Sequence, residues 1–597
     1  MIDSTLLVST LKGQLNDLLA DLGRQVDTVA DIGDPLRREY QAAFDAERTG
    51  WTFSEWADDR LTQVAVGWLL GCVFVRFCED NALVDDPMIS GRSDGERGNA
   101  AVLARAAQQD YFRANPTHSD REYLQHAFRR AAELPGLDGV LGEGHSPLWL
   151  TDPSADACTE LLALFRRTDD AGNLVLDFTD PQRSTRFLGD LYQDLSEHAK
   201  KTYALLQTPD FVEEFILDRT LEPAIESVGL ANVSVIDPTC GSGHFLLGAF
   251  ERLWQRWSDA EPAMAADLRA AKALDAVWGV DINPFAAAIA RFRLLVAAMQ
   301  HGGQRRLADV KGYPIHVAVG DSLLWGAAQQ SLPGMEGAGG ADDQFLYATE
   351  DADALRDTFE RRFSAVVGNP PYIVPKDKAA NAAYRKLYGS CHRQYSLGVP
   401  FTELFFNLAE PANPATAKRA GFVGMITANS FMKREFGGKL IADYIPKWDL
   451  THVVDTSGAY IPGHGTPTVI LFGRNQPPVA DTIRAVQGIR GEPSTPADPT
   501  KGLVWTAIVN QIDDPGSESD YISVADTERS RFATHPWSIG GGGAAELKER
   551  LERTCTRSVE RNRFLSASAH ITVRTTCSPV ERCRRRMRWN VYQAGIR

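Results

Sequence analysis

The sequence has few cysteines and no long apolar run. Its eight cysteines are spread over 597 residues and never occur as Cys-x-x-Cys, which excludes a disulfide framework and a zinc module of that spacing. The longest apolar run, residues 64–75, has twelve residues, whereas a membrane span needs ~20. The N-terminus also lacks the basic patch, apolar core and cleavage site of an export signal. We therefore expect a cytoplasmic protein with reduced thiols and no membrane partner.

Compositional extremes are absent as well, but charge is unevenly distributed. Apolar residues make up 44% and charged residues 24% of the chain, which excludes wholesale disorder and a fibrous repeat. The net charge is −15. Residues 553–597, the arginine-rich tail, hold eleven arginines, no lysine and two glutamates, so they carry +9 and leave −24 for residues 1–552. Because its charges repel one another and its apolar content is low, we expect the tail to be unfolded or poorly packed.

The first 200 residues are predicted to be helical. Ser119 and Glu122 form a capping box before a run of apolar residues at helical spacing, and residues 135–136, Pro-Gly, end that helix. A second helix is predicted to begin at Thr208, read as a cap, with Pro209 in its first turn.

From residue 233 onward, short β-branched runs alternate with helical ones. This alternation predicts an α/β fold with a mostly parallel sheet and helices on both faces. Seven strands are predicted, at residues 233–237, 277–281, 316–321, 363–367, 421–427, 452–455 and 468–472. Residues 331–343, 476–504 and 540–543 are predicted as loops from their glycine or proline content. Open α/β sheets bind ligands at the carboxyl ends of their strands, so we expect the functional site there.

A glycine turn follows the first predicted strand. Residues 237–243 read Asp-Pro-Thr-Cys-Gly-Ser-Gly, and the two glycines let a ligand approach the backbone at a helix N-terminus. The third position of a dinucleotide fingerprint is Leu246, and Asp237 would repel a pyrophosphate. A cation without phosphate, S-adenosylmethionine, suits this turn better. The alternative is a tight turn that binds nothing.

Two further strands also end on acidic residues. Asp281 is followed by Ile282, Asn283 and a helix that begins at Pro284, and its carboxylate can accept both ribose hydroxyls of an adenosine. The alternative is a helix cap supplied by Asn283. Asp321, followed by Ser322, ends the third strand, where it can accept from the amino group of an adenine. Its alternative is an ordinary aspartate turn.

The sequence Asn369-Pro370-Pro371-Tyr372 ends the fourth predicted strand. Two prolines fix the backbone, so the Asn369 side chain and the Pro370 carbonyl can converge on one amino group. An exocyclic amine such as adenine N6 is a poor nucleophile, because its lone pair is delocalised into the ring. Accepting its hydrogens would localise that lone pair, while Tyr372 stacks on a flipped base. The alternative is simply a strand stopped by proline.

Taken in order, these four motifs resemble those of the amino-group DNA methyltransferases. Residues 188–192 and 205–212 are similar, more closely, to the adenine-specific methyltransferases of the phage growth limitation and BREX anti-phage systems. The resemblance implies a Rossmann-like S-adenosylmethionine-dependent methyltransferase sheet with an α-helical N-terminal domain. It implies methyl transfer to adenine N6 in double-stranded DNA, with the adenine flipped out, alongside other phage-defence proteins. It also implies that residues 421–431 and 463–468 form a later strand and the target-base loop.

The predicted site combines catalytic and cofactor-binding residues. The catalytic residues are Asn369, Pro370, Pro371 and Tyr372. The cofactor-binding residues are Thr208 and Phe211, which the resemblance places beside the cofactor, and Asp237, Pro238, Cys240, Gly241, Gly243, Asp281, Ile282, Asp321 and Ser322. No metal site is predicted. The predicted domains are residues 1–200 (helical), 201–475 (methyltransferase), 476–552 (linker and start of a missing target-recognition region) and 553–597 (tail).

The chain departs from the family pattern, which keeps alternatives open. Family members are usually far longer, so a truncation or frameshift is expected after the catalytic domain. A catalytically inactive fragment that binds only cofactor or partners is one alternative, favoured by the charge of −24, because DNA binders carry a basic face. A protein-glutamine methyltransferase is another, since amide nitrogens pose the same chemical problem. A cytosine C5 enzyme is excluded, because no Pro-Cys dipeptide occurs.

Overall fold

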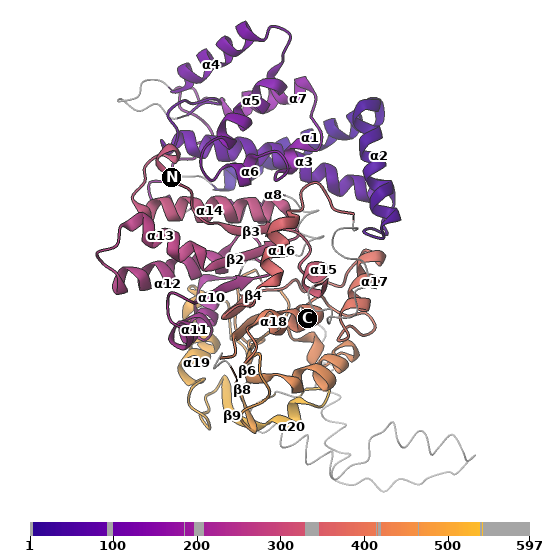
Figure 1. Cartoon of the computed structure of the whole chain (residues 1–597), viewed down its shortest axis with the longest axis vertical. Coiled ribbons are helices and arrows are strands. Elements are labelled where there is room, and N and C mark those ends of the chain that lie inside the picture. Colours follow the sequence, from indigo (N-terminus) through magenta and orange to yellow (C-terminus); the bar gives the residue numbers. More distant parts are fainter. Residues whose placement is uncertain are drawn as a thin grey trace, which may run out of the picture. The chain divides into compact units, whose positions relative to one another are not determined.

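The structure is a computed structural model (Figure 1). It describes residues 4–91, 100–183, 185–195, 208–328, 345–413, 415, 419–463, 465–537 and 540. The predictions for the arginine-rich tail and the loop at residues 331–343 lie outside the described residues.

The N-terminal part of the chain is helical, as predicted. Its helices are α1 (Ser4–Thr28), α2 (Ala30–Asp45), α3 (Phe53–Asp80), α4 (Ala100–Ala114), α5 (Asp120–Ala132), α6 (Asp138–Leu141), α7 (Ala155–Phe165) and α8 (Arg186–Leu195). The capping box predicted for α5 is confirmed: Ser119 and Glu122 each cap the other's backbone N–H. Helix α3 is long and apolar enough to cross a membrane, but its apolar window is fully buried here, as in a core helix.

One mixed sheet of nine strands follows. Its strands are β1 (Val235–Asp237), β2 (Val277–Asp281), β3 (His316–Val319), β4 (Ala365–Gly368), β5 (Phe422–Ala428), β6 (Asp449–Asp455), β7 (Thr468–Arg474), β8 (Thr482–Gly488) and β9 (Ile522–Glu528). Their order is β3-β2-β1-β4-β5-β7-β6-β8-β9. Strands β1 to β5 pair in parallel, whereas β7 is antiparallel to β5 and β6.

The sheet is covered on both faces, because successive side chains of a strand point to opposite sides. In β4, Ala365 and Val367 belong to one core cluster, and Val366 belongs to the other. The first face carries α10 (Asp210–Asp218), α11 (Leu221–Val228), α12 (His244–Ala260), α13 (Ala266–Asp275), α14 (Pro284–Gly302) and α19 (Leu503–Gln511). The second carries α15 (Ser322–Ala328), α16 (Ala352–Glu360), α17 (Lys378–Leu387) and α18 (Gly398–Leu408). In Figure 1, α10–α13 lie to the left of the sheet and α15–α18 to the right.

Helix α14 joins the N-terminal helices to the sheet (Figure 1). Its residues Phe285, Ile289 and Phe292 pack into the core of the N-terminal helices. Ala287, Ala290 and other small residues pack against the sheet side. Helix α14 is buried over most of its surface, as expected of a helix between two layers, and its buried Arg291 and Arg293 donate to backbone carbonyls.

The predicted fold class is confirmed, with two local corrections. All seven predicted strands are present within a few residues of the expected positions. The prediction of a loop over residues 476–504 is wrong in part, since β8 lies within it and pairs with β6 and β9. Strand β9 had no counterpart among the predicted strands. Strands β8 and β9 are the last two strands at one end of the strand order. Their residues are only partly buried, so their sequences contain fewer apolar residues than those of the central strands.

Candidate active site

The strand order reverses between β1 and β4, and ligands of open α/β sheets bind at such a point. A pocket lies there, at the carboxyl ends of β1 to β4. Six predicted cofactor-binding residues line it: Pro238, Gly241, Asp281, Ile282, Asp321 and Ser322. Asn369 and Pro371, from the predicted catalytic set, line it as well. The pocket thus brings together four motifs that span more than a hundred residues of sequence.

Asp281 lies at the end of β2 with one backbone donor on each carboxylate oxygen. The N–H of Asn283 donates to Oδ1 at 2.8 Å, and the N–H of Gly241 donates to Oδ2 at 2.9 Å. A carboxylate oxygen accepts about two hydrogen bonds, so each can accept one further donor. Asn283 also caps α14 by accepting from Phe285, so this turn is a helix cap and part of the pocket at once.

Asp237 is buried and does not line the pocket. Its Oδ1 accepts from the backbone and hydroxyl of Thr239, at 2.8 and 3.0 Å. It lies against the backbone of Gly368, where a Cβ would be 2.5 Å from Oδ1. Gly368 has a φ of +154°, so both the close approach and the backbone conformation call for glycine. This contact brings the end of β1 against the end of β4.

The two glycines of the turn have different surroundings. Gly241 has a φ of +54°, and nothing lies within 4 Å of where its Cβ would be. Gly243 has a φ of +85°, and a Cβ there would be 2.9 Å from the Cβ of Ala290, so it packs α12 closely onto α14. Cys240 is buried beside Gly279, and burial raises the pKa of its thiol well above the usual value. Only Gly241 of these three lines the pocket.

Asp321 connects the pocket to α17. Its Oδ1 caps α15 by accepting from the N–H groups of Leu323 and Leu324, and its Oδ2 accepts from the hydroxyl of Tyr384. Ser322 donates to the carbonyl of Pro238 at 2.6 Å, which ties the end of β3 to the glycine turn. Tyr384 itself lines the pocket.

The three aspartates at the strand ends make the pocket electrostatically unfavourable for an anion. Burial raises the pKa of Asp237 to about 7 and that of Asp281 to about 6. Burial also raises the pKa of Asp321. At Asp237 and Asp281, the pKa rise is opposed by hydrogen bonds to the carboxylates and not by a neighbouring cation. A ligand that carries positive charge would therefore favour the ionised carboxylates.

Asn369 is held by a residue far away in the sequence. Its Nδ2 donates to the hydroxyl of Thr208 at 3.2 Å, so Oδ1 is the atom of this amide that can accept. The prediction that Thr208 caps a helix is wrong, because Pro209 occupies the N-cap position of α10 without a side-chain cap. The buried Thr208 hydroxyl instead accepts the hydrogen bond from Asn369 Nδ2. Burial raises the pKa of the neighbouring Tyr372 phenol, and the Asn369 side chain opposes part of this rise.

The remaining predicted residues do not line the pocket. Pro370 is buried and Tyr372 is half-buried in the loop after β4. Phe211 packs edge-on against Trp505 of α19, with 4.8 Å between ring centroids.

Sequence reasoning missed five residues that line the pocket: Thr239, Leu323, Tyr384, Leu397 and Phe401. Thr239 and Leu323 adjoin predicted residues and could have been included on that ground. Tyr384, Leu397 and Phe401 lie in or near α17 and α18, whose sequences carry no motif. Only the packing of these helices against the sheet brings them to the pocket.

Comparisons with known proteins show which families the sequence is similar to. Residues 275–460 match the model of the Eco57I restriction-modification methylase family, and residues 223–322 match that of the MmeI DNA-methyltransferase domain. The chain is 48% identical to adenine-specific methyltransferase PglX of Streptomyces coelicolor, over 92% of this chain and 46% of that protein. It is 22% identical to the restriction enzyme and methyltransferase RM.Eco57I of Escherichia coli, over 65% of this chain and 38% of that protein.

The chain spans about half the length, or less, of these curated relatives. Among solved structures, a nuclease-deletion mutant of the Type ISP restriction-modification enzyme LlaGI is 13% identical, with a TM-score of 0.48. That match covers 80% of this chain and 35% of the other. The chain is thus similar to the adenine-specific methyltransferase PglX, and its residues 275–460 are similar to the Eco57I restriction-modification methylase family.

Proposed function

We propose that this chain is a site-specific DNA methyltransferase that transfers a methyl group from S-adenosylmethionine to N6 of an adenine flipped out of double-stranded DNA. The observation that carries the proposal is the position of Asn369. Its amide lines the same pocket as Asp281, immediately after β4, with Nδ2 held by Thr208. Similarity to the adenine-specific methyltransferase PglX supports adenine as the substrate. A role in anti-phage defence beside other proteins is proposed from the resemblance of residues 188–192 and 205–212 to methyltransferases of such systems.

The pocket residues fit S-adenosylmethionine. Each oxygen of Asp281 has capacity for one ribose hydroxyl, and Gly241 has open space where other residues carry a side chain. Ile282 is 49% exposed at the pocket and offers apolar surface to an adenine ring. When bound, S-adenosylmethionine supplies an electrophilic methyl group on a sulfonium, whose charge suits the aspartates at the strand ends.

The chain's own residues would activate the amine. Asn369 Oδ1 and the Pro370 carbonyl oxygen are acceptors for the two hydrogens of adenine N6. Accepting them localises the nitrogen lone pair where it can attack, and Thr208 keeps Oδ1 in the accepting orientation. No general base is required beforehand, because the nitrogen can lose its proton after it has gained the methyl group. Tyr372 provides an aromatic face for the flipped base.

A methyl-transfer assay tests the proposal. The full chain is incubated with labelled S-adenosylmethionine and unmethylated double-stranded DNA, and the DNA is digested to nucleosides. We expect label in N6-methyladenine. Cofactor binding without transfer to DNA would contradict the proposal and favour a fragment that only binds cofactor or partners. Label in protein glutamine would contradict it in favour of a glutamine methyltransferase.

A further inference from the structure

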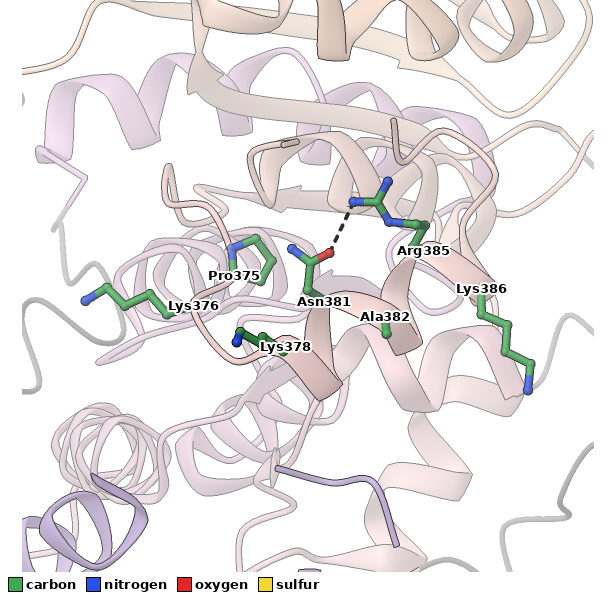
Figure 2. Close-up of a pocket in the computed structure, with 7 residues that line it drawn as sticks. All are labelled: Pro375, Lys376, Lys378, Asn381, Ala382, Arg385 and Lys386. Carbon is green, nitrogen blue, oxygen red and sulfur yellow. Dashed lines mark hydrogen bonds between the residues drawn. The ribbon is translucent and has the colours of Figure 1, made fainter. Parts of the chain in front are cut away.

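Helix α17 and the loop before it form a basic island in an acidic chain. Residues 375–393 hold five lysines or arginines and a single acid, Asp377, whereas residues 1–552 carry a net charge of −24. Lys376, Lys378, Arg385 and Lys386 are all exposed. They line an open surface hollow of about 500 Å³, with Lys376 and Lys386 at its two ends (Figure 2). We call these four residues and their hollow the α17 basic face.

The single acid of this segment does not neutralise the basic face. Asp377 caps α17 by accepting from the N–H groups of Ala379 and Ala380. It also accepts from the hydroxyl of Thr49 and the N–H of Gly50, in the loop between α2 and α3. Its carboxylate therefore docks α17 against the N-terminal helices, and five basic residues against this one acid leave a net charge of +4 on residues 375–393. Within the described part of the chain, neither Lys378 nor Lys386 has a carboxylate partner.

Arg385 is held in position from its own neighbourhood. Its guanidinium donates to Asn381 Oδ1 at 3.3 Å, as Figure 2 shows, and to the carbonyl of Arg393 at 2.6 Å. It also lies over the ring of Tyr395, 5.4 Å from the centroid. These partners are neutral, so the guanidinium keeps its full charge for a ligand.

The opposite face of α17 belongs to the cofactor pocket. Tyr384 lines that pocket and donates to Asp321. Tyr388, just beyond the helix, donates to the carbonyl of Leu323. A helix is about 10 Å across, so a ligand on the α17 basic face lies one helix diameter from the pocket. The helix begins only six residues after Tyr372, in the loop that would hold the flipped base.

We propose that the α17 basic face binds backbone phosphates of the DNA strand that carries the target adenine. This inference rests on the proposed function, because it names the substrate surface of the same site. Lysine and arginine are the residues that contact DNA phosphates, and such contacts fix the register of the protein without reading sequence. Because the α17 basic face lies beside the catalytic loop, it would hold the DNA strand next to the nucleotide that is flipped out of the double helix.

Salt-dependent DNA binding by the full chain tests this inference. Each phosphate contact contributes about 0.9 to the slope of log K against log salt concentration. We expect Lys378→Gln/Lys386→Gln to lower the slope by ~2 and to weaken binding at least tenfold at 0.1 M salt. The matched control, Lys311→Gln/Lys501→Gln, removes the same charge; Lys311 precedes the opposite end of β3, and Lys501 lies outside α17. We expect it to leave the slope unchanged.

Two further measurements separate this inference from the proposed function. Calorimetry with S-adenosylmethionine should give the same affinity for the α17 variant and the unmodified chain, which shows that the variant is folded. If the unmodified chain methylates DNA while the α17 variant retains its slope and affinity, the inference is wrong and the proposed function stands. An equal fall in slope for both variants would also overturn it, because net charge alone would then explain the loss. If the unmodified chain does not methylate adenine, the proposed function fails.

Discussion

The two sides of the strand-order reversal have opposite electrostatic character. On one side, β1 and β2 end on Asp237 and Asp281, and Asp321 follows β3. Asp237 and Asp321 are buried, Asp281 is half-buried, and backbone N–H groups donate to all three. On the other side, the loop after β4 presents neutral acceptors, led by Asn369, whose Nδ2 donates to the neutral Thr208. The charged side suits a cationic cofactor, and the neutral side suits an uncharged amine. Binding and chemistry should therefore be separable by substitution.

The largest effect is expected on the neutral side. Asn369→Ala removes the acceptor for the target amine, so methyl transfer should fall at least about a hundredfold, as when a preorganised contact to a reacting atom is lost. Cofactor affinity should change less than about twofold, since Asp281 is untouched. Single-turnover kinetics and calorimetry measure the two quantities. The matched control is Asn232→Ala, at an exposed residue after α11; normal methylation by the Asn369 variant would refute the assignment.

The charged side should show the reverse pattern. Asp281→Ala removes two hydrogen bonds to a charged acceptor, each worth ~1.5–3 kcal/mol, and should weaken S-adenosylmethionine binding at least about tenfold. With saturating cofactor, the rate of the methyl-transfer step should recover much of its normal value. Unchanged affinity in calorimetry would mean that the cofactor binds elsewhere.

A smaller effect is expected from Thr208, which acts through Asn369. Thr208→Val keeps the shape but removes the hydroxyl that accepts from Nδ2, so the amide is no longer held. The loss of one neutral hydrogen bond, ~1 kcal/mol, corresponds to about a fivefold lower rate at unchanged cofactor affinity. Thr208→Ser should restore the rate, because it restores the hydroxyl. A fall in cofactor affinity instead of rate would place Thr208 on the charged side of the site.

The smallest effect is the pH dependence of cofactor binding. Burial raises the pKa of Asp237 to about 7 and that of Asp281 to about 6, so lowering the pH from 8 to 6 protonates part of this pair. Protonation removes acceptors and negative charge, so affinity should fall by ~3-fold over that range. Asp281→Asn should flatten the profile. An affinity that rises toward pH 6 would contradict the role of the carboxylates.

The same groups should affect the cofactor-free protein in the opposite direction. Their folded-state pKa values exceed those of the unfolded chain, so the native state binds more protons between about pH 4 and 7. Their contribution to stability is therefore present at low pH and is lost as the pH rises through about 6 to 7. Thermal unfolding of the cofactor-free chain at pH 6 and 8, compared with Asp237→Asn, measures this contribution.

Sequence reasoning succeeded where a function depends on neighbouring residues. Asp281, Asn283 and Pro284 form a strand end and a helix start within four residues, and the structure has both. It failed where distant segments meet. Thr208 resembles a helix cap in its local sequence, but its partner is 161 residues away. Tyr384 lies in an unremarkable helix and reaches the pocket only because α17 packs onto α15 and Asp321.

The sequence by itself determined the α/β class, the positions of seven strands and the motifs at their carboxyl ends. These features are encoded in apolar periodicity, glycine, proline and caps, which act over a few residues. Tertiary structure alone decided which face of α17 enters the pocket, how Asp377 docks that helix, and which partner orients Asn369. Such contacts depend on how layers of helices pack on the sheet, and packing joins residues that have no relation along the chain.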